Sequence, residues 1–157
     1  RDALVGLVGS EMCIRDRNNK YQIVYEDKPE DSAWGVIGRG VGGYNKEKAG
    51  ENNFQRLCYT LIAPDGEIAG GILCEMYWGW LYVDLLWVQE ELRGRGYGHR
   101  LLTQAEEEGR QRGATNVYLD TFSFQAPDFY EKHGYQVFGT LPDYPPGQTR
   151  FFMTKQL

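Results

Sequence analysis

A glycine-rich loop between a strand-like run and a helical run is the segment best suited to chemistry. Residues 88–98 read Val-Gln-Glu-Glu-Leu-Arg-Gly-Arg-Gly-Tyr-Gly. The first backbone N–H groups of a helix lack helical partners, the helix dipole adds partial positive charge, and glycines let an anion approach the backbone. Arg93, Arg95 and Arg100 add full positive charges. The loop therefore predicts a binding site for a phosphate group.

Other glycine-loop motifs do not fit this segment. It has no Gly-Lys-Ser or Gly-Lys-Thr, which a P-loop requires, and Gly94, Gly96 and Gly98 have the wrong spacing for the dinucleotide-binding pattern G-x-G-x-x-G. RNA-binding Arg-Gly segments are long and disordered, whereas this one lies between a buried strand and an amphipathic helix. These three alternatives are therefore disfavoured.

The elements on either side of the loop would hold it in place. Trp80–Val88 is almost continuously apolar, which predicts a central strand buried on both faces. The spacing of Leu101, Leu102, Ala105 and Glu108 predicts a helix that ends near Gly113. Further strands are predicted at 117–122 and on both sides of the turn at 142–147, with a short helix at 127–133.

The first half of the chain predicts a strand, a helix and a hairpin. Residues 21–25 alternate apolar and polar side chains, and the apolar residues of 34–44 recur at helical spacing despite the intervening glycines. The strand-like runs 56–63 and 67–77 flank a Pro-Asp-Gly turn signal. Because strands alternate with helices in the second half, the sequence predicts a single α/β domain with a mixed central sheet flanked by helices.

Two motifs in this order resemble the GNAT superfamily of N-acetyltransferases. Arg93-x-x-Gly96-x-Gly98 is similar to the R/Q-x-x-G-x-G/A loop with which the family holds the pyrophosphate of coenzyme A. Residues 126–135, Ala-Pro-Asp-Phe-Tyr-Glu-Lys-His-Gly-Tyr, resemble its A-x-x-F-Y-x-x-x-G-F/Y segment. The order of elements extends the resemblance to about residues 20–157. It implies a GNAT fold and acetyl transfer from acetyl-coenzyme A to a primary amine by direct attack in a ternary complex.

The resemblance also implies where the coenzyme would bind. The pantetheine arm would pair with the end of the central strand, and the pyrophosphate would contact the glycine loop. Many relatives carry an Asn at the position of Ser123, and either Ser123 or Gln125 is expected to hold the coenzyme in its place. The other expected contacts are Leu86, Trp87, Val88, Arg93, Gly94, Arg95, Gly96, Tyr97 and Gly98.

Acetyl transfer from a thioester requires an acid that protonates the departing thiolate. Tyr130 matches the tyrosine that the family places near the coenzyme sulfur, so it is the predicted general acid. A phenol has an unperturbed pKa of about 10, which suits this role. The alternative is that Tyr130 packs in the core beside Phe129 and Tyr135.

The acceptor must reach the thioester as a neutral amine, which calls for a base. Alternation along the central strand predicts that Asp84 shares one face with Tyr82, Leu86 and Val88, and Asp84 is the candidate base. Asp120, on the neighbouring strand, and Glu75 are alternatives. Any of the three could instead serve as a counter-ion for the amine.

The sequence defines the acceptor site less clearly than the coenzyme site. Trp78, Trp80 and the helical region at 30–45 are expected to border it, unless the tryptophans simply pack on the sheet. A small-molecule amine is the predicted acceptor. The alternatives are a protein or peptide amine, or a chain that binds acyl-coenzyme A without catalysis.

The histidines and cysteines predict no metal site. His99 and His133 have no partners at metal-ligand spacing and are expected to be solvated, with His99 close enough to the loop to contact a phosphate. Cys58 and Cys74 lie in strand patterns and are expected to be small core residues rather than nucleophiles.

Composition excludes several partners. A net charge of -5 disfavours nucleic acid and anionic membranes. Three cysteines without a paired spacing indicate a reducing, cytoplasmic location, and no apolar run approaches the roughly 18–20 residues of a membrane span. The sequence permits a homodimer without requiring one.

The N-terminal segment calls for separate treatment. Residues 7–16 resemble one reading frame of a transposase sequencing adapter. We therefore expect residues 1–17, with Cys13, to be an artefactual or disordered extension, and residues 18–157 to form the acetyltransferase domain.

Overall fold

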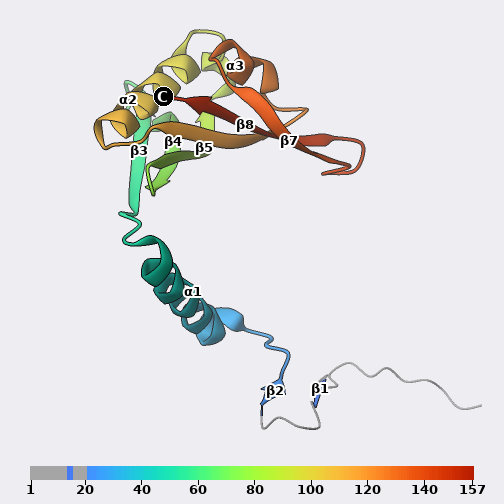
Figure 1. Cartoon of the computed structure of the whole chain (residues 1–157). Coiled ribbons are helices and arrows are strands. Elements are labelled where there is room, and N and C mark those ends of the chain that lie inside the picture. Colours follow the sequence, from blue (N-terminus) through green and yellow to red (C-terminus); the bar gives the residue numbers. More distant parts are fainter. Residues whose placement is uncertain (1–13, 16–20) are drawn as a thin grey trace, which may run out of the picture. The chain divides into compact units, whose positions relative to one another are not determined.

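The computed structural model describes residues 14–15 and 21–157, which belong to two compact units, 1–50 and 51–157 (Figure 1). The first unit contains the strands β1 (Ile14–Arg15) and β2 (Gln22–Ile23), which pair antiparallel, the 3-10 helix η1 (Pro29–Asp31) and the helix α1 (Ala33–Ala49). The strand predicted at 21–25 is shorter than expected, because its pairing with β1 involves only two residues of each strand. Apart from β1, the predicted extension and Cys13 lie outside the described residues.

Helix α1 confirms the helical spacing of the apolar residues between 34 and 44. The helix ends at Gly50, whose φ of 78° is readily adopted by glycine. None of the residues of α1 is buried, and all members of the core come from the second unit. No helix in the described residues combines the length and the apolar character that crossing a membrane requires.

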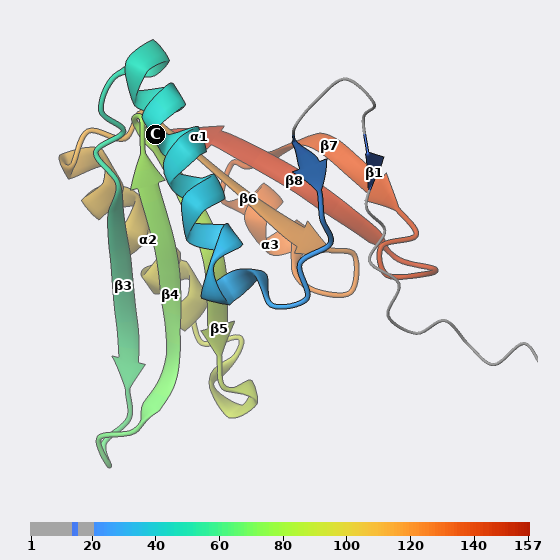
Figure 2. The ribbon, with the colours of Figure 1, turned by 90° about the horizontal axis from the view of Figure 1, so that it is seen from below.

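The second unit is built on a six-stranded sheet with the order β3-β4-β5-β6-β8-β7 (Figure 2). Strands β5 and β6 are parallel, and the other neighbouring strands are antiparallel. This mixed sheet with its helices confirms the predicted α/β, GNAT-like fold. The strands span Gln55–Ile62 (β3), Ile68–Tyr77 (β4), Trp80–Val88 (β5), Asn116–Phe122 (β6), Gln136–Pro142 (β7) and Thr149–Gln156 (β8).

The predicted hairpin between β3 and β4 is confirmed at its turn. The backbone N–H of Ala63 donates to the carbonyl of Glu67 at 2.9 Å, and that of Gly66 donates to the carbonyl of Ala63 at 2.9 Å. Gly66 has a φ of 89°, which explains why glycine follows Pro64 and Asp65 in this turn.

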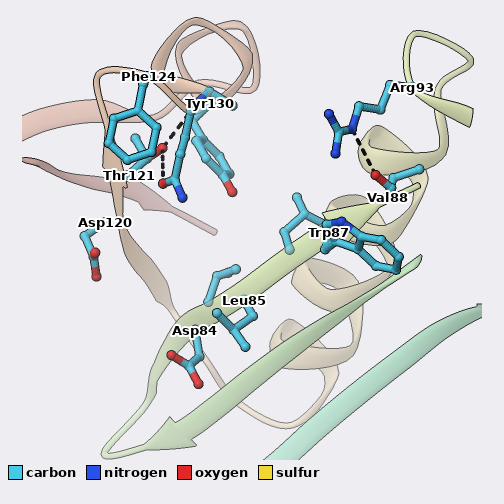
Figure 3. Close-up of a pocket in the computed structure, with 13 residues that line it drawn as sticks. Asp84, Leu85, Trp87, Val88, Arg93, Asp120, Thr121, Phe124 and Tyr130 are labelled. Carbon is cyan, nitrogen blue, oxygen red and sulfur yellow. Dashed lines mark hydrogen bonds between the residues drawn. The ribbon is translucent and has the colours of Figure 1, made fainter. Parts of the chain in front are cut away.

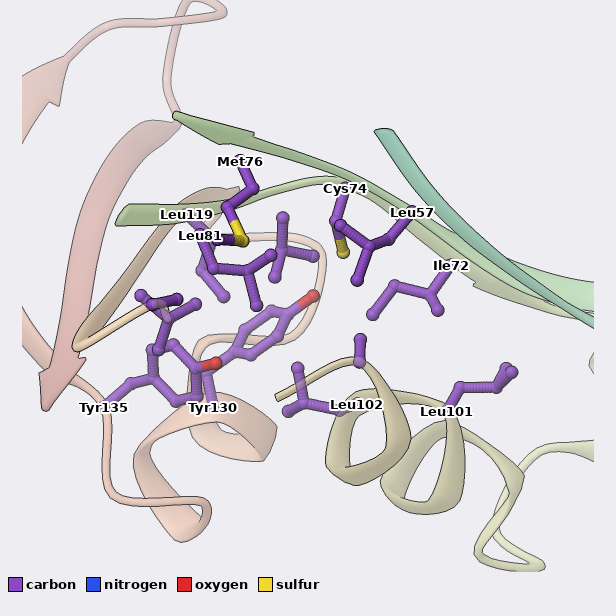
Figure 4. Close-up of a cluster of buried hydrophobic side chains, with 14 of the residues drawn as sticks. Leu57, Ile72, Cys74, Met76, Leu81, Leu101, Leu102, Leu119, Tyr130 and Tyr135 are labelled. Carbon is purple, nitrogen blue, oxygen red and sulfur yellow. The ribbon is translucent and has the colours of Figure 1, made fainter. Parts of the chain in front are cut away.

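Two helices cover one face of this sheet. Helix α2 (Tyr97–Gln111) connects β5 to β6, and helix α3 (Pro127–Lys132) follows β6, while the 3-10 helix η2 (Glu90–Leu92) precedes the glycine loop. Leu102 of α2 packs among Ile72, Leu81 and Leu119 of the sheet, in the core shown in Figure 4. All four are at most 1% exposed. Burying such a side chain contributes about 1.5–3 kcal/mol, so this face holds the unit together.

The opposite face of the sheet is more open than predicted. Trp80, Leu85 and Trp87 of β5 are exposed, so the prediction that β5 is buried on both faces is wrong. The reason is that α2 and α3 both pack against the other face. Cys58 is exposed as well, which corrects its predicted place in the core, whereas Cys74 is buried as expected.

Candidate functional site

The parallel strands β5 and β6 separate partway along their length. Their pairing runs from Trp80 with Asn116 to Val83 with Leu119 and ends there. Beyond this point lies a cavity of about 440 Å³. Its lining consists of Val83, Asp84, Leu85, Leu86, Trp87, Val88, Arg93, Asp120, Thr121, Phe124, Gln125, Ala126 and Tyr130 (Figure 3). The last residues of β5 therefore have a backbone edge that is not paired with β6, and an extended ligand could hydrogen-bond to it.

A β-bulge occurs in β5 where the strands begin to separate. The register between β4 and β5 shifts, and Asp84 is left without a partner on β4. A bulge breaks the alternation of side chains, so Val83 before it and Leu86 after it both pack toward the core. The prediction that Asp84 shares one face with Tyr82, Leu86 and Val88 is therefore wrong, because Tyr82 lies on the opposite face from Leu86 and Val88.

The glycine loop forms a second cavity, of about 460 Å³, at the beginning of α2. Gly94 and Gly96 have φ values of 73° and 85°, a conformation that glycine adopts without strain. Gly96 precedes the first helical residue, and no side chain caps this end of α2. The helix therefore directs uncapped backbone N–H groups into a site lined by glycines, which is the arrangement that binds phosphate.

The two cavities adjoin each other. Both are lined by Leu86, Val88, Arg93, Ala126 and Tyr130. The structure thus connects the separated strands to the glycine loop through one set of side chains, which gives space for a long ligand with an anionic end.

The predicted coenzyme contacts in the glycine loop do not all lie at a cavity. Gly94, Gly96, Tyr97 and Gly98 line the loop cavity, whereas Arg95 lines neither cavity. The Nε atom of Arg93 donates to the carbonyl of Val88 at 3.0 Å. This bond holds the guanidinium of Arg93 at the junction of the two cavities.

Ser123 and Gln125 were alternatives for holding the coenzyme, and only Gln125 lies at the cavity. The Ser123 hydroxyl donates to Oε1 of Gln148 at 2.6 Å and accepts from the backbone N–H of Thr149 at 3.1 Å, so it joins the loop after β6 to the hairpin of β7 and β8. Gln125 accepts a bond from the backbone N–H of Phe122 at 3.0 Å and lines the cavity between the strands. The geometry therefore favours Gln125 over Ser123.

Tyr130 both packs in the core and lines the cavities, which are the two alternatives that the sequence suggested for it. It is 8% exposed, and its ring packs edge-on against Phe129 and Tyr135, with centroids 5.1 and 5.7 Å away. It also lines both cavities. Burial, followed by the neighbouring Cys74 and Asp120, raises the pKa of the Tyr130 phenol to about 12. The hydroxyl therefore keeps its proton at neutral pH.

The three candidate carboxylates are distinguished by their partners. Asp120 accepts bonds from Nε and Nη2 of Arg150 at 2.8 and 2.7 Å and from the hydroxyl of Tyr82 at 3.3 Å. Glu75 lies 3.7 Å from Arg56. Asp84 has no ion pair or hydrogen bond with another side chain among the described residues, and it lines the cavity between the strands.

Comparison with known proteins agrees with this geometry. The family described as "Acetyltransferase (GNAT) family" matches residues 15–135. The chain belongs to this family. It is 45% identical over 93 residues to a blasticidin-S acetyltransferase from Streptomyces morookaense, covering 59% of this chain and 68% of that protein. The crystal structure of an acetyltransferase from Bacillus cereus superposes with a TM-score of 0.74 and 36% identity, covering 78% of this chain and 90% of that one.

A more distant structure shares the fold of this GNAT acetyltransferase. It is an aminoglycoside 6'-N-acetyltransferase complexed with coenzyme A, with a TM-score of 0.56 and 21% identity over 82% of this chain and 83% of that one. At this identity the likeness concerns the fold alone.

The two histidines of this GNAT chain are in contact, which the sequence did not predict. Nδ1 of His99 lies 2.6 Å from Nε2 of His133, and Nδ1 of His133 lies 2.7 Å from the carbonyl oxygen of Phe129. His99 also lines the loop cavity. The expectation that both are solvated holds for His99, which is exposed, whereas His133 is half-buried. Their rings connect the start of α2 to the end of α3.

Sequence reasoning also missed Phe124, which lines the cavity between the strands, and Arg150, which pairs with Asp120 of the same lining. Phe124 is 58% exposed. An apolar ring between two polar residues, Ser123 and Gln125, is a signal that could have identified it. By contrast, Trp78 and Trp80 line neither cavity, and Trp80 packs edge-on against Tyr118 at 6.0 Å.

Proposed function

We propose that this GNAT acetyltransferase binds acetyl-coenzyme A along β5 and the glycine loop and transfers the acetyl group to the primary amine of a small molecule. Two adjoining cavities with Tyr130 in the lining of both carry this proposal. The anionic end of the coenzyme suits the uncapped start of α2 and Arg93. The blasticidin-S acetyltransferase relative supports acetyl transfer to a small molecule.

The unpaired edge of β5 fits the extended arm of the coenzyme. Beyond Val83, residues 86–88 can offer backbone donors and acceptors on the side that faces the cavity. Hydrogen bonds of this kind would orient the thioester without requiring particular side chains. Bound acetyl-coenzyme A supplies the activated acetyl group, and the acceptor amine attacks it directly.

Tyr130 is the proposed general acid at the leaving sulfur. Its pKa of about 12 keeps the phenol protonated, so the hydroxyl is available as a donor. This value lies above the ordinary pKa of a thiol, about 8.5. The Tyr130 hydroxyl would therefore first stabilise the leaving sulfur through a hydrogen bond, which strengthens while negative charge accumulates on the sulfur.

Asp84 is the proposed partner of the amine. Asp120 and Glu75 each have a cationic neighbour, so Asp84 is the carboxylate with an uncompensated charge at the cavity. It can attract the ammonium form of the acceptor and take up its proton through a water molecule. Direct attack in a ternary complex follows, since acceptor and thioester share one cavity.

Thiol release from acetyl-coenzyme A, measured over a panel of small amines and lysine peptides, tests this function. We expect turnover with small amines, a loss of about 10²- to 10⁴-fold in kcat for Tyr130→Phe, and unchanged coenzyme binding in that variant. Gly96→Asp is the binding control, because it places a side chain and a negative charge at a φ of 85° in the loop.

The other outcomes identify the alternatives. Turnover with lysine peptides alone would indicate a protein N-acetyltransferase. Coenzyme binding that is lost in Gly96→Asp, without turnover of any amine by the wild type, would indicate a non-catalytic acyl-coenzyme A binding module.

A further inference from the structure

We infer that the acceptor is a small molecule whose cationic amine is joined to a flat ring, with the amine at Asp84 and the ring against an aromatic wall formed by Phe122, Phe124 and Tyr144. The inference rests on the proposed function and specifies its substrate class. It depends on the charge distribution in the cavity and on aromatic side chains that are not part of the hydrophobic core.

The charges of the cavity are separated along its length. Arg93 lies at the end near the glycine loop, and Asp84 lies at the bulge, as Figure 3 shows. The charge of Asp120, also in the lining, is balanced by its ion pair with Arg150. The end of the cavity around Asp84 therefore favours a cation, while the opposite end favours an anion.

The aromatic wall lies across the cavity from Asp84, where Phe124 stands beside Thr121 and Tyr130 (Figure 3). The rings of Phe122 and Phe124 stack in parallel, with centroids 5.3 Å apart and an angle of 4° between their planes. Tyr144 meets Phe122 edge-on at 5.8 Å. Phe124, which lines the cavity, is 58% exposed, and Tyr144 is 46% exposed. Such rings gain free energy when a flat apolar group covers them.

Arg150 fixes this wall and limits what it can bind. Its guanidinium lies 5.5 Å from the Phe122 ring centroid and 5.1 Å from that of Tyr144, and it also holds Asp120. Because Arg150 is already paired, it offers no unbalanced charge to an anionic substrate. The free surface of Phe124 therefore suits a ring, and the free charge of Asp84 suits the amine attached to it.

A lysine side chain fits this combination less well. It carries its amine on a flexible aliphatic stem, which has no flat face to stack on Phe124 and loses more rotamer freedom when it is held. The structure thus favours a ring-bearing amine over an alkylamine of similar size.

Matched amines and matched variants test this inference. Phenethylamine and n-hexylamine carry the same charged group on a ring or on a chain, and both are assayed by thiol release and by equilibrium binding in the presence of coenzyme A. Phe124→Leu removes the ring from the cavity. Phe138→Leu is the control, because Phe138 is similarly exposed, at 61%, and lines neither cavity.

We expect wild-type protein to prefer phenethylamine. In Phe124→Leu this preference should fall about 3- to 10-fold, as the loss of one aromatic contact implies, whereas Phe138→Leu should keep it. Asp84→Asn should weaken binding of both amines about equally. An unchanged preference in Phe124→Leu, or a wild-type preference for n-hexylamine, would overturn the inference. Selective binding of phenethylamine without turnover would support the inference and refute the proposed acetyl transfer.

Discussion

Nδ1 of His99 lies 2.6 Å from Nε2 of His133, which joins the first turn of α2 to the end of α3. The second ring nitrogen of His133 lies 2.7 Å from the carbonyl of Phe129 and must donate its proton there. Nε2 of a neutral His133 is then an acceptor, so Nδ1 of His99 is the donor between the rings. The pair thereby links the glycine loop to the helix that carries Tyr130.

A double-mutant cycle should reveal this link as a coupling free energy. His99→Ala and His133→Ala each remove the bond between the rings, so the double variant loses it only once. We expect an interaction of about 0.5–1.5 kcal/mol in the free energy of unfolding measured with urea. If the two single effects simply add, the contact does not stabilise the fold.

Gly70 lies where β4 passes close to the coenzyme end of β5. A Cβ atom at Gly70 would be 2.8 Å from the backbone oxygen of Trp87, so Gly70→Ala must displace β5 at its proposed pantetheine-binding residues. We expect a loss of about 1–3 kcal/mol in stability. Coenzyme binding, measured by calorimetry, should weaken about tenfold, as the loss of one or two hydrogen bonds implies.

The neighbouring Gly71 supplies the matched control for this prediction. A Cβ atom there would be 2.9 Å from the backbone oxygen of Tyr59 on β3, on the side away from β5. Gly71→Ala should therefore cost similar stability while leaving coenzyme affinity within about twofold of wild type. Equal losses of affinity in both variants would mean that general destabilisation, and not the position of β5, controls binding.

Much of the fold could be predicted because its signals are local. The turn at Gly66, the helical spacing in α2 and the glycine loop are all contained within short segments of the sequence. The exposed face of β5 was missed, since Trp80 and Trp87 are as apolar as the buried side chains of the same strand. Apolar character alone does not show which face the helices cover.

The site was harder to predict because its decisive contacts join distant residues. The bulge at Asp84 follows from the register with β4, and the strand sequence alone suggests regular alternation. The pairing of Asp120 with Arg150, and of Ser123 with Gln148, connects β6 or the loop after it to the last hairpin. No local pattern predicts these pairs, although the first leaves Asp84 as the carboxylate without a cationic partner at the cavity and the second holds Ser123 away from it.

The two described cysteines should differ strongly in reactivity. Cys58 is exposed, whereas burial, reinforced by Asp84 and Cys58, raises the pKa of the Cys74 thiol to about 12. Because the thiolate is the reactive form, we expect iodoacetamide to modify Cys58 readily and Cys74 only when the protein unfolds. Mass spectrometry of a Cys13→Ser variant, labelled with and without urea, measures this. Rapid labelling of Cys74 in the folded protein would contradict the buried position.

Ionisation of Tyr130 should destabilise the protein at alkaline pH. Its pKa rises from 10.0 in the unfolded reference to about 12 in the fold, chiefly through burial. A raised pKa means that the neutral phenol is favoured in the folded state, so its contribution is complete below pH 10.0 and is lost as pH rises to about 12. At 1.36 kcal/mol per pKa unit, the loss is about 2–3 kcal/mol.

Urea unfolding at a series of alkaline pH values tests this dependence in wild type and Tyr130→Phe. Removing the hydroxyl removes one ionisation, so the free energy of unfolding should fall less steeply with pH above 10.0 in the variant than in wild type. Other phenols keep some slope in both proteins, since partial burial also raises the pKa of Tyr82 and Tyr118 to about 12. Parallel curves for the two proteins would show that Tyr130 ionises in the fold as readily as in the unfolded chain, which is inconsistent with a buried general acid.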